Sequence, residues 1–216
     1  RQVVPAVGCT EPMAVALCTA RATEDMGRRP EKIRVLLSGN MLKNAMGVGI
    51  PGTGMIGLPI AVALGAIVGK SQYQLEVIKD LTPEKLEEGK AFIADPHRID
   101  IKLKENITEK LYIEVTCSAG DDSATAVIAG SHTNFVYECC NGKVLLDKRQ
   151  CTEDTEEHKG VDLDMKTVWE FATTTPLEEI AFLEEARDYN IRAAEESRKG
   201  NYGHCLGKTI DRPLSH

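Results

Sequence analysis

Aromatic residues are scarce in this sequence of 216 residues: they make up 5% of it and include a single tryptophan. Basic residues are also in short supply, because 26 Lys and Arg face 33 Asp and Glu, for a formal net charge of −7. A basic surface supplies most of the affinity for nucleic acids and anionic membranes. We therefore expect neither a nucleic acid nor a membrane as partner.

Cysteine pairs of the C-x-x-C type are absent as well. The sequence has seven cysteines, an odd number, and two of them, Cys139 and Cys140, are adjacent. This arrangement does not suit a framework of disulfides. Free thiols are typical of a reducing compartment, so the sequence favours a cytoplasmic protein.

A long hydrophobic run, an initiator methionine and a signal peptide are lacking too. The longest apolar stretch, 55–68, is interrupted by two glycines and a proline. It is also shorter than the roughly 20 residues that a membrane span needs, which indicates a core helix instead. The first residues, RQVVP, run directly into a helix start, so we interpret the sequence as part of a longer protein.

Hydrophobic periodicity predicts an α+β fold in which helices pack on a mainly antiparallel sheet. The second half of this region has period-two patterning and the hairpin signal Asn141-Gly142, which indicates an antiparallel meander. The first half alternates helices with short apolar runs. In chain order the predicted elements are helix 11–26 capped by Thr10, strand 33–37, a glycine-rich loop 38–57, an apolar helix to 69, strand 75–79, helix 82–94, and strands 99–103, 112–116, 125–129, 135–139 and 144–146.

Residues 1–150 thus form one predicted α+β domain, with the glycine-rich loop and a polar turn as its distinctive parts. An acidic linker is predicted at 151–164, because this stretch has no periodicity. Residues 165–216 then begin a helical domain, with helices at 166–173 and, after a Thr175 cap, at 176–199. No stop signal follows, so we expect this helical domain to be truncated.

The first candidate for chemistry is the GCTEP stretch at 8–12, where Cys9 lies just ahead of a helix. The helix dipole and free N–H groups at this end favour a thiolate, which can bind a metal or act as a nucleophile. A small buried residue beside a helix cap is the structural alternative. Cys18, in contrast, lies on the apolar stripe and is predicted to be core.

The second candidate is the glycine-rich loop, whose backbone can approach a ligand closely before an apolar helix begins. Residues 1–71 carry a net charge of +4 and the remaining residues −11, so we expect an anionic small molecule to bind more favourably in this part of the chain. Helix N-termini after such loops bind carboxylate or phosphate, although tight packing alone can also require the glycines. The polar residues predicted to bind substrate in this loop are Ser38, Asn40, Lys43, Asn44 and Thr53.

The third candidate is the short connection between two predicted strands, where Ser131, His132, Thr133 and Asn134 follow one another. These groups can bind the carboxylate and ammonium of an amino acid, and an imidazole can act as general acid or base near neutral pH. Equally, a turn can use such side chains to satisfy its own backbone.

Three stretches of the sequence together resemble one known family. They are PAVGCTEP at 5–12, the run from SGN at 38–40 to KNAMGVGIPGTG at 43–54, and GSHTN at 130–134. In content and order they resemble the L-cysteine desulfidase family, relatives of the iron–sulfur L-serine dehydratases that are often named after the serine dehydratase alpha chain. The resemblance covers essentially the whole chain, and the family's C-terminal half has no counterpart in it.

The resemblance implies a lyase with a [4Fe–4S] cluster, in which cysteines leave one iron open as a Lewis acid, and without pyridoxal phosphate. Cys9 matches the N-terminal family cysteine, and the other ligands are expected outside this chain. The implied reaction is β-elimination of L-cysteine to pyruvate, sulfide and ammonia, with L-serine dehydration as the alternative. Either Lys43 or His132 can be the base that removes the α-proton, and this fragment alone is expected to be inactive.

Two other classes of function compete with the lyase: a module that binds small carboxylates without chemistry, and a structural half that docks on a catalytic partner. The expected partners are a small amino-acid substrate and the missing C-terminal half, and we also consider a homodimer.

Overall fold

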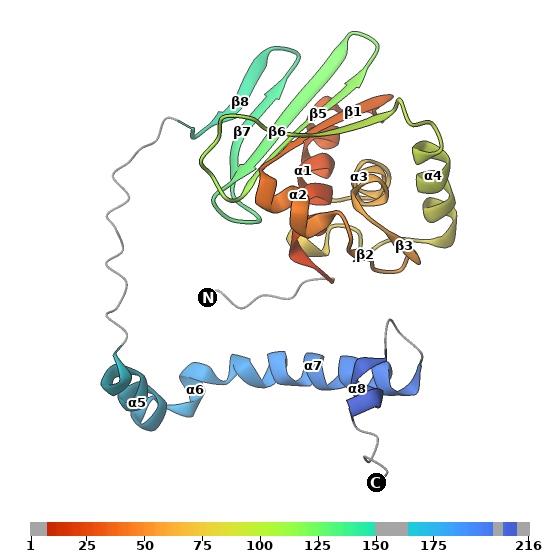
Figure 1. Ribbon diagram of the computed structural model, residues 1–216. Helices are drawn as coiled ribbons and strands as arrows, with labels where there is room; N and C mark the ends of the chain where they lie inside the picture. Colours follow the sequence, from red (N-terminus) through yellow and green to blue (C-terminus); the bar gives the residue numbers. More distant parts are fainter. Residues whose placement is uncertain (1–7, 150–163, 201–204, 211–216) are drawn as a thin grey trace. The chain divides into compact units, whose positions relative to one another are not determined.

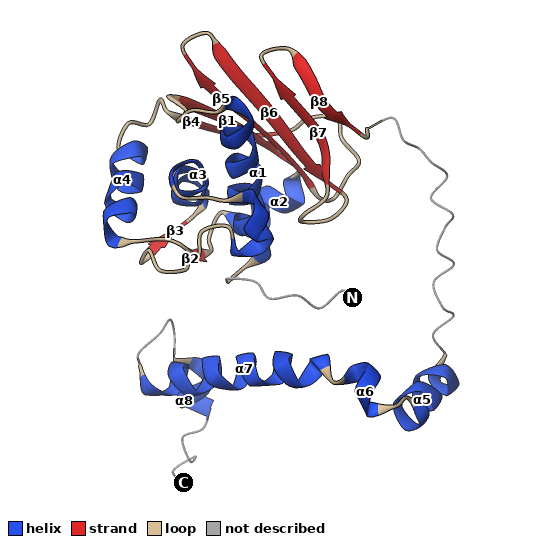
Figure 2. Cartoon of the chain, turned by 180° about the vertical axis from the view of Figure 1, so that it is seen from behind, coloured by secondary structure: helices blue, strands red, loops and turns tan. Residues whose placement is uncertain are grey.

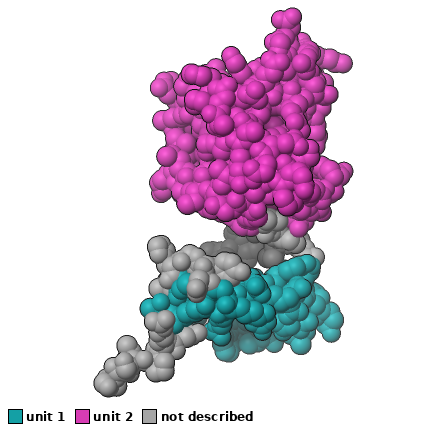
Figure 3. Space-filling view, turned by 90° about the vertical axis from the view of Figure 1, so that its right-hand side faces the viewer, with its two compact units in different colours: residues 1–4, 153–216 teal, residues 5–152 magenta. Residues whose placement is uncertain are grey.

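The computed structural model describes residues 8–149, 164–200 and 205–210 (Figure 1). The chain divides into two compact units, one of residues 5–152 and one of residues 1–4 and 153–216 (Figure 3). The first unit contains the helices and strands of the α+β fold described below. The predicted linker 151–164 lies outside the described residues except for Asp164, which caps the first helix of the second unit.

The larger unit contains a six-stranded sheet with the strand order β4-β1-β5-β6-β7-β8. The four strands from β5 to β8 form the predicted antiparallel meander, and β5 also pairs antiparallel with β1. The α+β fold with a mainly antiparallel sheet is therefore confirmed. The strands are β1 (Lys32–Leu37), β4 (Ile99–Leu103), β5 (Tyr112–Ala119), β6 (Asp122–Ala129), β7 (Phe135–Cys140) and β8 (Lys143–Asp147).

Helices cover one face of this sheet (Figure 2). Side chains alternate along β5, so that Ile113, Val115 and Cys117 are buried towards the helices while Tyr112 and Glu114 face the other side. Burial of this apolar face stabilises the two layers together. The helical elements of the unit are α1 (Thr10–Met26), α2 (Gly39–Ala45), α3 (Leu58–Ile67), the 3₁₀ helix η1 (Ser71–Glu76) and α4 (Pro83–Ile93).

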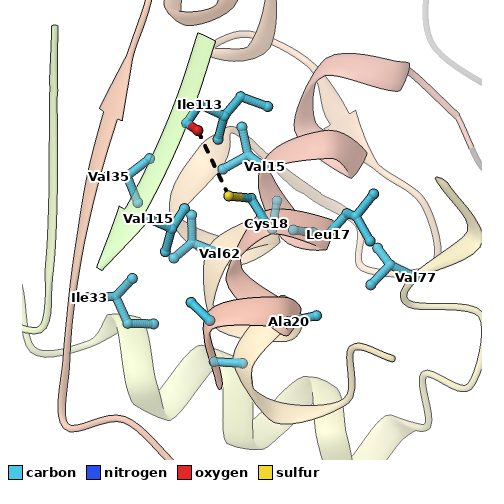
Figure 4. Close-up of a cluster of buried hydrophobic side chains, with 14 of the residues drawn as sticks. Val15, Leu17, Cys18, Ala20, Ile33, Val35, Val62, Val77, Ile113 and Val115 are labelled. Atoms are coloured by element: carbon cyan, nitrogen blue, oxygen red, sulfur yellow. Dashed lines mark hydrogen bonds between the residues drawn. The ribbon is translucent and has the colours of Figure 1, made fainter. Parts of the chain in front are cut away.

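Cys18 lies in the centre of the core, as the sequence predicts. Its side chain is fully buried, and the thiol donates weakly to the carbonyl oxygen of Ala126 at 3.3 Å. It also donates weakly to the carbonyl oxygen of Ile113 at 3.9 Å (Figure 4). Burial raises the pKa of this thiol well above its usual value. Cys18 is therefore a packing residue that ties α1 to two strands.

Helix α1 crosses α3 at very short range because α3 has a glycine at the contact. A Cβ atom added to Gly65 would lie 2.5 Å from the carbonyl oxygen of Ala16. We expect Gly65→Ala to lower the free energy of unfolding by about 2–3 kcal/mol, since the backbones must separate. Gly47→Ala is the matched control, because nothing lies within 4 Å of its added Cβ. Urea denaturation of both variants checks this, and equal stability would contradict it.

Three predicted elements of this unit differ from the structure. The run 75–79 is not a strand but the end of η1 followed by a turn, with Leu75, Val77 and Ile78 buried. A short apolar run indicates that its residues are buried, but it does not determine whether their backbone forms a strand, a helix or a turn. Strand β4 pairs parallel with β1, not antiparallel. The glycine-rich loop is also more regular than predicted, because it contains α2 and a small hairpin of β2 (Gly49–Ile50) and β3 (Met55–Ile56).

The second unit is helical, as predicted, with one difference. The predicted helix 176–199 is divided at Ala181 into two helices, and Thr175 caps the end of α5 instead of starting the next helix. Its helices are α5 (Met165–Thr174), α6 (Leu177–Ile180), α7 (Phe182–Lys199) and α8 (Leu206–Ile210).

Across both units, none of the described helices combines the length and apolar character that crossing a membrane requires.

Candidate functional site

The candidate site lies at the end of the sheet where β1 and β6 finish. Helix α2 follows β1 directly, and the turn 130–134 follows β6. Backbone hydrogen bonds hold this end together, because Gly130 donates to Leu111 and Ser38 donates to Tyr112. The first turn of α1 is brought to the same place.

Glu11, in that first turn, joins three segments of the chain. Its carboxylate accepts hydrogen bonds from the Cys9 thiol at 2.9 Å and from the Asn44 side-chain amide at 3.5 Å. The Thr10 hydroxyl donates to it at 3.1 Å. The Cys9 hydrogen bond is the largest cause of the lowered pKa of Glu11, and the charge of His132 lowers it further. We call Cys9, Glu11, Asn44 and His132 the Glu11 cluster.

The structure corrects the expectation that Cys9 favours a thiolate. Partial burial and the hydrogen bond to the Glu11 carboxylate raise the pKa of the Cys9 thiol. Both effects penalise a negative sulfur, and they outweigh the helix N-terminus. Cys9, not Thr10, is the N-cap residue of α1, and its side chain makes no capping hydrogen bond.

The glycine-rich loop touches the Cys9 motif through the hairpin of β2 and β3. Gly8 has a left-handed φ of 74°, and a Cβ atom added to it would lie 2.6 Å from Cγ of Pro51. Only glycine fits both the conformation and the close approach. Two of the sequence motifs are therefore neighbours in space.

Two of the predicted substrate ligands use their hydroxyls within the fold. Ser38 donates to the carbonyl oxygen of Lys110 at 2.8 Å and accepts from the N–H groups of Met41 and Tyr112, both at 3.4 Å. A hydroxyl has one donor and two acceptor positions, so Ser38 is fully occupied.

Thr53 is similarly engaged: it donates to the carbonyl oxygen of Ile50 at 2.6 Å and accepts from the N–H of Met55 at 2.9 Å. It is also buried. These bonds hold the turn between β2 and β3, so in this conformation Thr53 shapes the loop.

The turn 130–134 shows one of the two alternatives that the sequence left open, in which a side chain bonds to the backbone of the turn. Asn134 uses its amide for the backbone of the turn, donating to the carbonyl oxygen of Ala129 at 2.9 Å. Ser131 is exposed, whereas His132 and Thr133 are half-buried. His132 is the member of this turn whose charge acts on Glu11.

Asn40 and Lys43 are exposed on α2. Asn40 lines an open groove of about 570 Å³ between the start of α2 and the segment that connects β4 to β5. Ser38 also lines this groove, but His132, Asn44 and Thr53 do not. The predicted ligands are thus distributed between this groove, the Glu11 cluster and two structural turns.

Glu11 is the site residue that the sequence analysis missed. It lies within the quoted motif 5–12, two residues after Cys9, but an acidic residue in the first turn is also common as a dipole partner. The signal that distinguishes it is contact with Asn44, which is 33 residues away.

Among the residues that the structure describes, no group of three or more His, Cys, Asp and Glu side chains is arranged to hold a metal ion. Cys139 and Cys140 are successive residues of β7, so their side chains point to opposite faces of the sheet. Cys140 packs against the core, and Cys139 pairs across from Thr125.

Asp25, on α1 but outside the cluster, has an unusual environment. Its Oδ2 atom is buried without a hydrogen-bond partner among the described residues. Burial, with further contributions from the nearby Glu138 and Glu24 carboxylates, raises the pKa of Asp25 to about 6, although Arg21 opposes this. The charged form is therefore disfavoured in the fold.

A group with a raised acid pKa destabilises the fold once it ionises, so stability should fall as pH rises from about 4 to about 6. We expect Asp25→Asn to remove that decrease and to be more stable at pH 7 by about 1 kcal/mol, a value reduced for the partial exposure of the side chain. Thermal melting between pH 4 and 8 measures the effect. A variant whose profile parallels the wild type would contradict it.

Comparison with known proteins finds similar sequences of about twice this length. The chain is 61% identical over 216 residues to a UPF0597 protein of Bacteroides fragilis and 60% identical over 216 residues to one of Bacteroides thetaiotaomicron, covering 50% of each. It is 41% identical over 215 residues to a UPF0597 protein of Photobacterium profundum, again covering 50% of it. The chain therefore spans about half the length of these relatives. No family model matches it, and no solved structure matches it.

Proposed function

We propose that this chain is part of an iron–sulfur lyase that eliminates the β-substituent of a small amino acid, with L-cysteine as substrate and pyruvate, sulfide and ammonia as products. The same chemistry on L-serine releases water instead of sulfide. The proposal starts from the resemblance of three sequence motifs to the L-cysteine desulfidases.

The observation that carries the proposal is the Glu11 cluster. The motifs at 5–12 and 130–134 and the glycine-rich loop are far apart in the sequence, yet Glu11 of the first motif accepts a hydrogen bond from Asn44 of the loop, and the charge of His132 acts on Glu11. A scaffold that needed these motifs only for separate turns would have no reason to bring them together. Convergent polar groups from several elements are typical of a binding or catalytic site.

A [4Fe–4S] cluster, which would supply a Lewis-acidic iron for the leaving group, fits the described residues only in part. Such clusters are held by several cysteine thiolates. Cys9 offers one thiol at the site, and no three or more His, Cys, Asp and Glu side chains of the described residues form a group that could hold a metal ion. The proposal therefore assigns the remaining ligands to the rest of the full-length protein, and we derive no step through the cluster.

The roles proposed for this chain's own residues are positioning and proton transfer. Asn44 can donate to a substrate carboxylate once it leaves Glu11, and Asn40 lies one helical turn before it, on the same side of the short helix α2. We assign removal of the α-proton to His132 in preference to Lys43. The charge of His132 acts on the carboxylate of Glu11, which can stabilise the imidazolium that forms, whereas Lys43 is exposed.

The exposed apolar side chains of the helical unit support the proposal that this unit packs against the rest of the full-length protein. No described residue of α5, α6 or α7 is buried, and Met165, Trp169 and Leu177 are 80%, 70% and 76% exposed. Short helices in water depend on packing of an apolar face. We propose that these helices pack against the polypeptide that the longer relatives have in addition.

Anaerobic reconstitution tests the function. The full-length protein is supplied with iron and sulfide, and bound iron, absorbance near about 400 nm and pyruvate from L-cysteine and L-serine are measured. We expect a coloured, oxygen-sensitive enzyme that releases sulfide from L-cysteine, while the 216-residue chain stays colourless and inactive. A colourless full-length protein that binds cysteine without turnover would instead establish a carboxylate-binding module.

A further inference from the structure

Strand β4 is one edge of the sheet, and its outer side is unpaired among the described residues (Figure 2). The Ile33 N–H donates to the Arg98 carbonyl at 2.7 Å, and the Lys104 N–H donates to the Leu37 carbonyl at 2.8 Å. Because backbone groups alternate in direction along a strand, the N–H and C=O groups of the intervening odd-numbered residues point away from β1. These residues are Ile99, Ile101 and Leu103.

The sequence of β4, IDIKL, is complementary to itself when two copies run antiparallel about Ile101. In that register Ile101 lies opposite its own copy, and Ile99 lies opposite Leu103. These are the residues with outward backbone groups, so each would form a hydrogen-bonded pair across the interface. Asp100 would lie opposite Lys102 in both halves of the pairing, at the shorter separation of non-hydrogen-bonded pairs.

The two faces of β4 are also compatible with pairing to a second copy. Ile99, Ile101 and Leu103 pair with the buried residues of β1 and therefore lie on the helix-covered face, yet Leu103 is 51% exposed. Asp100 and Lys102 lie on the opposite face, where they form an exposed ion pair at 2.8 Å. A two-fold axis through Ile101 would place apolar against apolar and acid against base.

The other edge of the sheet, β8, lacks this regularity. Its pairing with β7 shifts register between Glu138 and Cys139, at a bulge or similar irregularity. Bulges disrupt the regular spacing of edge groups and are a common protection against edge-to-edge pairing. β4 has an unbroken register with β1 over all its residues.

We propose that two copies of this chain associate through β4, forming one continuous sheet with a two-fold axis at Ile101. The partner is a second copy because the strand's charge and apolar patterns complement themselves, and an isologous contact closes after one pairing. A short edge of this kind has the small interface of weak, concentration-dependent dimers.

Charge reversal and its compensation test the pairing in the 216-residue chain. Sedimentation velocity from about 5 to about 200 µM should show a dimer for the wild type. Lys102→Asp should raise the dissociation constant of the dimer about tenfold. In this variant Asp100 of each copy lies opposite the new aspartate of the other copy, so two pairs of like charges repel. The double variant Asp100→Lys with Lys102→Asp should restore the dimer. Val144→Lys on β8 is the control and should leave it unchanged.

Circular dichroism and melting of each variant confirm that the fold is intact, as expected for exposed positions. A wild type that stays monomeric throughout the range would overturn the proposal. So would a dimer that Lys102→Asp leaves unaffected, which would place the contact on another surface such as the apolar helices of the second unit. A double variant that remains dissociated would refute the antiparallel register.

Discussion

Cys9→Ser in the full-length protein is expected to abolish cluster-dependent lyase activity while leaving the fold intact. A hydroxyl cannot replace a thiolate at a soft iron site. The fold should tolerate the change well, because Cys9 is the N-cap of α1 and makes no capping bond, whereas serine is among the preferred N-cap residues. Serine can also donate to Glu11 as the thiol does. Loss of activity therefore cannot be ascribed to unfolding.

Cys18→Ala is the matched control for this experiment. Its thiol is fully buried between α1 and the sheet, so the variant should lose about 1–2 kcal/mol of stability through the small cavity that remains. Iron content and turnover of the folded variant should stay near the wild-type values. Pyruvate formation, bound iron and urea denaturation are measured for both proteins. Equal loss of activity in the two, with unchanged stability, would show that Cys9 has no special role.

His132→Ala is expected to lower kcat by about two to four orders of magnitude, the usual contribution of a general base. The charge of the imidazole acts on the Glu11 carboxylate, and removal of the ring eliminates the proposed proton acceptor. KM should change little, because the base acts mainly in the transition state. Added imidazole should restore part of the rate. Steady-state kinetics with L-cysteine, with iron content measured in parallel, provide the comparison.

Two further variants make this prediction specific. His97→Ala, in the exposed turn before β4, should behave as the wild type. Lys43→Ala should retain most of its kcat if His132 is the base. A large loss of kcat in Lys43→Ala with an active His132→Ala would reverse the assignment. Asn40→Ala and Asn44→Ala should mainly raise KM, because a carboxylate contact is made in the ground and transition states alike.

Local signals were sufficient for much of the fold. Periodicity located α1 within one residue, and Gly27 ends it with a left-handed φ of 73° and hydrogen bonds to the last turn. The Asn141-Gly142 pair predicted the hairpin between β7 and β8, and both residues have the positive φ values that such a turn requires. In each case the conformational preference belongs to the residue itself or to its immediate neighbours.

Only the tertiary structure decided which distant segments meet. β4 has the alternating pattern of any half-buried strand, and nothing in IDIKL distinguishes a parallel from an antiparallel neighbour. In the run 75–79, the apolar residues predicted burial but not the backbone conformation, which is the end of η1 and a turn instead of a strand. Glu11 gained its importance from Asn44 and His132, which the sheet and α2 bring to the start of α1. Propensity acts over a few residues, whereas such contacts depend on how the whole core packs, and this determined the candidate site.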